Sequence, residues 1–115
     1  MTTSFVDYIR CIIANGTANS NIVYSSQMHD SSAIGIQAPA SLDAHTFVIE
    51  VNSQKDGLGN WTRLYDRTGT AVLVPTADNS MWYPELPSFP AFRITDITGN
   101  VAAERIFIIT KLHNA

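Results

Sequence analysis

The chain has 115 residues and a mass of 12.6 kDa, a length that accommodates one domain of ordinary size. Hydrophobic residues make up 45% and charged residues 15%, so a core can form and an intrinsically disordered chain is excluded. The net charge is −3 and the seven basic residues are scattered, which excludes a nucleic-acid partner. Cys11 is the single cysteine, so internal disulfides and cysteine-based zinc sites are excluded as well.

The sequence also predicts no membrane partner and no secretory signal. No apolar run approaches the ~20 residues that a membrane helix needs. Residues 1–14 contain Asp7 and Arg10 and lack a basic stretch followed by a small-residue cleavage site. We therefore expect a soluble chain made in the cytoplasm.

The N-terminal segment is compatible with two secondary structures. Ser4 and Asp7 have the spacing of a capping box, and apolar residues recur behind them at helical intervals. Residues 8–14 are equally compatible with an isoleucine-rich strand that ends at the turn dipeptide Asn15-Gly16. Spacing alone does not decide between the helix and the strand.

Downstream, short strands separated by turns are expected. Residues 21–25 and 33–38 are weak strand candidates, whereas residues 46–52 alternate with a period of two and predict a half-buried strand. Residues 61–66 form the expected return strand, and the DRTG sequence at 66–69 predicts a tight turn.

The last third of the chain contains two further strand candidates. Pro84, Pro87 and Pro90 lie close together, so no helix is expected in the stretch that contains them. Residues 92–97 alternate, and residues 105–112 form the longest β-rich run, typical of a central strand. Together with a short β-branched run at 71–74, the pattern predicts an all-β antiparallel sandwich of about eight strands.

Candidate catalytic chemistry is missing from the sequence pattern. His29, His45 and His113 do not have metal-ligand spacing, and no serine or cysteine lies in a nucleophile motif. Cys11 lies among isoleucines, where a buried small apolar role is expected. We predict no catalytic residue, no metal and no cofactor, and a protein that is not an enzyme.

Aromatic residues gather in the second half of the chain. Trp61 and Phe92 are expected to fill the core, with Trp82 and Tyr83 packed under the proline-rich stretch. The alternative is that such rings form a contact surface for sugars or for protein, because flat aromatic side chains serve both roles.

The order of short motifs resembles that of small structural proteins of tailed phages. The motifs are IGIQAP, FVIEVNSQ, NWTRLYDRTG, FRITDITG and AAERIFIITK, and the resemblance extends over nearly the whole chain. It implies a jelly-roll or discoidin-like sandwich. It also favours an extended segment from Tyr8 to Ala14, so we expect an N-terminal arm over residues 1–7 and a single domain over residues 8–115.

What the resemblance implies about function is architectural. The chain is expected to be a capsid decoration, or cement, protein that binds the major capsid protein or another virion protein on the capsid surface. A homo-oligomer is expected, with a trimer favoured. The alternative is a carbohydrate-binding module or a tail- or fibre-associated sandwich used in host attachment. Candidate protein or glycan contacts are Trp82, Tyr83 and Phe5.

Overall fold

The computed structural model describes residues 4–24, 33–39, 45–52, 59–74, 81–82 and 91–114. None of these residues lies in a helix, and none contributes to a helix long and apolar enough to cross a membrane. The strands are β1 (Ser4–Ile13), β2 (Val23–Tyr24), β3 (Ala33–Gln37), β4 (Phe47–Asn52), β5 (Thr62–Arg63), β6 (Leu73–Val74), β7 (Met81–Trp82), β8 (Ala91–Asp96) and β9 (Arg105–Asn114).

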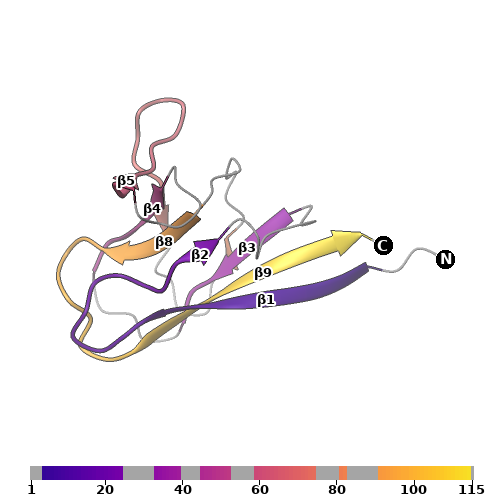
Figure 1. Ribbon diagram of the computed structural model, residues 1–115, viewed down its shortest axis with the longest axis horizontal. Helices are drawn as coiled ribbons and strands as arrows, with labels where there is room; N and C mark the ends of the chain where they lie inside the picture. The colour runs from indigo at the N-terminus through magenta and orange to yellow at the C-terminus, as the bar shows by residue number, and fades with distance from the viewer. Residues whose placement is uncertain are drawn as a thin grey trace.

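The strands form two sheets, and every strand pair is antiparallel (Figure 1). The first sheet has the order β1-β9-β3-β7, and the second has the order β2-β8-β4-β5, with β6 also paired to β4. The chain therefore changes sheet at every connection between consecutive strands except those from β4 to β5 and from β5 to β6, which is the arrangement of a double-sheet jelly roll. The predicted all-β sandwich is confirmed.

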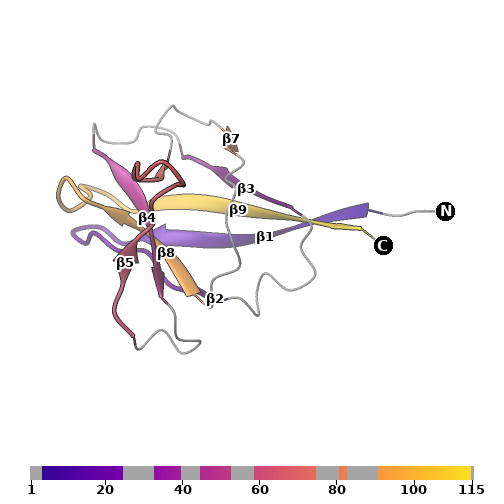
Figure 2. The same cartoon turned by 90° about the horizontal axis from the view of Figure 1, so that it is seen from above.

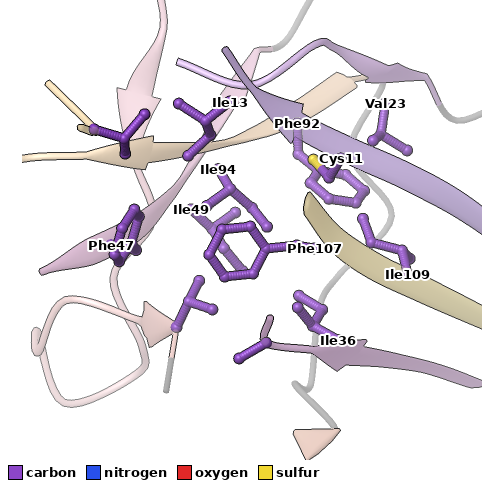
Figure 3. Close-up of a cluster of buried hydrophobic side chains, with 13 residues drawn as sticks. Cys11, Ile13, Val23, Ile36, Phe47, Ile49, Phe92, Ile94, Phe107 and Ile109 are labelled. Carbon is purple, nitrogen blue, oxygen red and sulfur yellow. The ribbon is translucent and has the colours of Figure 1, made fainter. Parts of the chain in front are cut away.

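The core lies between the two sheets and is filled by alternate residues of each. In β4, Phe47 and Ile49 are fully buried and face Phe107 of β9 (Figure 3). The rings of Phe47 and Phe107 meet edge to face, with centroids 5.4 Å apart, which is a favourable aromatic geometry. The full buried cluster comprises Cys11, Ile13, Val23, Ile36, Ala38, Phe47, Ile49, Val74, Phe92, Ile94, Val101, Phe107 and Ile109.

The N-terminal segment is a strand, which resolves the alternative between helix and strand. β1 begins at Ser4, whereas the sequence predicted an arm through residue 7 and a strand from Tyr8. The difference arises from long-range pairing, because Ser4 lies opposite Asn114 and the register continues without interruption to Ile13 opposite Arg105. The residues around Ser4 do not by themselves indicate that β9 will pair with them.

Two glycines provide the positive φ angles that their turns require. Gly16 has φ 78° between β1 and the segment that leads to β2, and Gly69 has φ 82° at the end of the predicted DRTG turn. In the latter turn the Asp66 carboxylate accepts bonds from the Thr68 and Thr70 amides, at 2.9 and 3.0 Å, and from the Thr68 hydroxyl at 2.7 Å. These bonds lower the pKa of Asp66, the Thr68 hydroxyl contributing most.

Candidate assembly surface

The feature that distinguishes this sandwich is its long ribbon of two strands, β1 and β9. Each has ten residues, whereas β3 pairs with β9 only from Ala33 opposite Leu112 to Gln37 opposite Ile108. In Figures 1 and 2 the two strands run together past the other strands, and the pair Ser4 and Asn114 closes the far end of this ribbon. β9 has a neighbour on each side, so β1 is the terminal strand of its sheet in the described part of the chain.

The inner half of the ribbon is anchored in the core. Cys11 and Ile13 of β1 and Phe107 and Ile109 of β9 are fully buried on one face. Their neighbours in sequence lie on the opposite face, where Ile12 and Ile106 form a directly opposed, half-buried pair. Apolar groups on both faces make this end of the ribbon a rigid base.

A serine connects the anchored end of β1 to the second sheet. Ser20 is 7% exposed, and its hydroxyl oxygen accepts bonds from the Ile94 amide at 2.9 Å and from the Cys11 thiol at 3.0 Å. The same hydroxyl donates to the Asn21 carbonyl at 2.8 Å. Every hydrogen-bonding capacity of this buried hydroxyl is used, and the two sheets are tied together at this point.

The thiol of Cys11 has a structural role, as expected from its apolar neighbours. The side chain is fully buried and belongs to the core cluster. Burial raises the pKa of the thiol above its ordinary value, and the bond with Ser20 only partly opposes this effect. A thiol with a raised pKa and no exposed surface is a poor nucleophile.

Asn21 covers part of the outer edge of β1. Its side-chain oxygen accepts from the Ile12 amide at 2.6 Å, and its side-chain nitrogen donates to the Arg10 carbonyl at 3.2 Å. The Asn21 backbone amide also donates to the Ile12 carbonyl at 3.3 Å. One residue therefore occupies three backbone groups that face away from β9.

A second polar cluster lies on the outer face of the other sheet. Glu50 Oε1 accepts from Arg93 Nε at 2.9 Å and lies 2.8 Å from Arg93 Nη2, while the Arg93 guanidinium stacks 4.3 Å from the Trp61 ring centroid. Thr95 Oγ1 is 2.9 Å from the same Glu50 oxygen. Because Glu50 neutralises Arg93, this cluster stabilises the sheet and presents no uncompensated cation to a ligand.

The structure corrects one sequence-based assignment and confirms another. Phe92 is buried in the core, as predicted, with 6% of its surface exposed. Trp61 is not part of the buried core cluster, because it is half-buried and covers the Arg93 side chain on the outer face. The aromatic–cation contact requires residues 32 positions apart to meet, which local patterning does not reveal.

The predicted contact residues do not form one site among the described residues. Phe5 lies in β1 opposite His113, and Trp82 lies in β7 opposite Ile36, so the two are on different strands of one sheet. Tyr83 and His29 lie outside the described residues. Groups of three or more metal-ligating side chains do not occur within the part of the chain that the structure describes.

His45 has a clear structural partner that sequence spacing did not indicate. Its Nδ1 lies 2.5 Å from Oδ2 of Asp96, whose side chain is fully buried at the end of β8. The other Asp96 oxygen accepts from the Thr98 amide at 2.9 Å and from the Gly99 amide at 3.2 Å. This arrangement holds the turn after β8 against the start of β4.

Comparison with known proteins gives one structural match. No family model matches the chain, and no curated protein matches it. A solved structure from work on Bacillus endospore appendages, described as a novel family of disulfide-linked pili, has a TM-score of 0.47 and 17% identity over 98% of this chain and 89% of that chain. A match at this level does not by itself assign a function.

These comparisons correct the identity that the motif order predicted. The resemblance to tailed-phage virion proteins was wrong, since the matching structure comes from a bacterial spore appendage and no phage family matches. The capsid decoration role, the host-attachment alternative, the capsid partner and the virion location are withdrawn with it. The physical reason is that a short motif such as NWTRLYDRTG reflects a strand followed by a turn, and unrelated β-sandwiches contain the same combination.

Proposed function

We propose that this protein is a structural subunit that self-associates by pairing β1 of one copy with β1 of a second copy. The observation that carries the proposal is the ten-residue terminal strand on the edge of the first sheet. A strand at a sheet edge presents a row of backbone donors and acceptors that can pair with another strand. The sequence predicted a domain over residues 8–115, and we propose that the domain each copy contributes begins with β1 at Ser4.

The lengths of the other edge strands favour β1 as its own partner. Within the described residues, the strands at the remaining sheet edges are β7, β2, β5 and β6, and each has only two residues. Short edge strands are a common way to avoid unwanted pairing. Among the described strands, a matching long edge therefore occurs only on a second β1, and two identical edges pair about a two-fold axis.

The outer half of β1 is the edge of a larger sheet over most of its length. β9 pairs with β3 from Leu112 to Ile108, opposite Val6 to Arg10 of β1, and only Ser4 and Phe5 lie beyond β3. A second copy that adds at β1 supplies backbone bonds along this edge, and it also supports the two-stranded end of the ribbon, because two strands alone are marginally stable in water.

The proposal predicts a two-fold dimer, whereas the sequence analysis favoured a trimer, and solution mass distinguishes them. Sedimentation velocity across a dilution series is expected to show a species of twice 12.6 kDa that dissociates on dilution. Val6→Pro removes a backbone amide on the outer edge and is expected to abolish the dimer, whereas Val6→Ala keeps the amide and the dimer. A monomer at every concentration, or dimers of equal strength in both variants, contradicts the proposal.

A further inference from the structure

We propose that Asn21 is an edge cap that restricts strand addition to the outer half of β1. The inference rests on the proposed function, since it specifies which part of the strand receives the second copy. The outer half is defined here as residues 4–9, and the capped segment as residues 10–12.

The contacts of Asn21 reproduce those of a neighbouring strand. Its side-chain oxygen and nitrogen bind the Ile12 amide and the Arg10 carbonyl, at 2.6 and 3.2 Å, and its backbone amide binds the Ile12 carbonyl at 3.3 Å. Backbone groups of alternate residues in a strand face the same edge, so these groups lie on the side where a second strand would add. A strand that paired along residues 10–12 would have to displace all three bonds.

The position of Asn21 is held by contacts independent of its side chain. Its carbonyl accepts from the buried Ser20 hydroxyl at 2.8 Å, and Ser20 is itself bonded to the Ile94 amide and carbonyl in the second sheet. The preceding residues also form isolated bridges, Ile13 with Ser20 and Asn19 with Thr95. The side chain of Asn21 is thus presented to β1 by a rigid corner rather than by a freely moving loop.

The consequence for assembly is a fixed length of pairing. Without the Asn21 side chain, the accessible edge gains the Arg10 carbonyl and the Ile12 amide, in the segment that is backed by the core. A longer exposed edge strand binds a second strand more tightly and with less defined register, the condition in which edge-to-edge aggregation begins. Asn21 therefore limits both the strength and the register of self-association.

The test compares Asn21→Ala with Asn15→Ala, a matched change in the preceding exposed turn. Each added backbone hydrogen bond contributes on the order of 1 kcal/mol, so loss of the cap is expected to tighten self-association by about tenfold or more. Asn15→Ala is expected to match the wild type. Sedimentation velocity measures the association constant of the dimer, and thioflavin fluorescence reports larger β-sheet assemblies.

Amide hydrogen exchange at Ile12 separates this inference from the proposed function and verifies folding. In dilute Asn21→Ala the Ile12 amide is expected to exchange faster than in the wild type, and at high concentration it is expected to regain protection. A monomeric wild type with an associating Asn21→Ala supports the cap while overturning the proposed function. If Asn21→Ala is folded, its Ile12 amide stays unprotected and its association constant is unchanged, the cap is overturned. Asn21→Asp keeps the acceptor oxygen and is expected to show an intermediate association constant.

Discussion

Asp96 and His45 form a contact of 2.5 Å between the end of β8 and the residue that precedes β4, across 51 positions of sequence. The Asp96 carboxylate is fully buried and also accepts the amides of Thr98 and Gly99. Three donors converge on one buried carboxylate, so this single side chain fixes the turn that leads toward β9.

Removal of that carboxylate is expected to destabilise the fold. Asp96→Ala leaves two amides without their acceptor and is expected to lower the free energy of unfolding by about 2–4 kcal/mol. Asp96→Asn keeps one acceptor oxygen and should cost less. Urea denaturation measures both, with the exposed Glu104→Ala as the control, expected within about 0.5 kcal/mol of the wild type. Equal stability of Asp96→Ala and Glu104→Ala would contradict the assigned role of Asp96.

The buried thiol of Cys11 predicts a loss of stability at alkaline pH. Burial raises the pKa of this thiol above its ordinary value of 9.0, so in the unfolded chain the thiol ionises at lower pH than in the folded protein. The free energy of unfolding therefore falls as the pH rises above about 9. Cys11→Ala removes this contribution, and denaturation at several pH values should show a shallower alkaline decline than in the wild type. Identical slopes would show that the thiol does not titrate differently on folding.

The Glu50–Arg93 pair is expected to be coupled, because both side chains are largely buried, at 18% and 19% exposure. Either Glu50→Gln or Arg93→Met leaves the partner charge without its counterion, and each should cost about 2 kcal/mol. The double variant should cost less than the sum of the two. Additive losses in this double-mutant cycle would mean that the contact contributes nothing to stability. With Trp82 replaced by Phe, the fluorescence of Trp61 provides a local reading, since Arg93→Met removes the cation that stacks on the ring.

Local patterning predicted the interior of the fold well and its edges poorly. The alternation at residues 46–52 correctly predicted β4, because a strand with one buried face has a period of two. The start of β1 at Ser4 depends on pairing with β9 across the whole chain, and local propensity contains no such information. The sequence therefore predicted an arm over residues 1–7, whereas Ser4 to Asp7 are the outer end of the ribbon on which the proposed function depends.

The contacts of the candidate surface were less predictable still. Asn21 stands in a polar stretch typical of a connecting loop, yet its side chain acts as a strand neighbour for Arg10 and Ile12. Its role follows from the corner that Ser20 makes with Ile94, a contact over 74 positions. Trp61 was likewise expected in the core because large aromatic residues are usually buried there, and its position over Arg93 became evident only from the three-dimensional structure.

The account depends on β1 receiving a second β1, and the amide of Val6 tests this most directly. Backbone groups alternate along a strand, so the Val6 amide lies on the same outer edge as that of Ile12, whereas the amide of Asp7 faces β9. Residue-resolved hydrogen exchange across a concentration series is expected to show Asp7 protected throughout and Val6 protected only when the dimer forms. Exchange of the Val6 amide at the same rate in the monomer and in the associated protein would contradict the account.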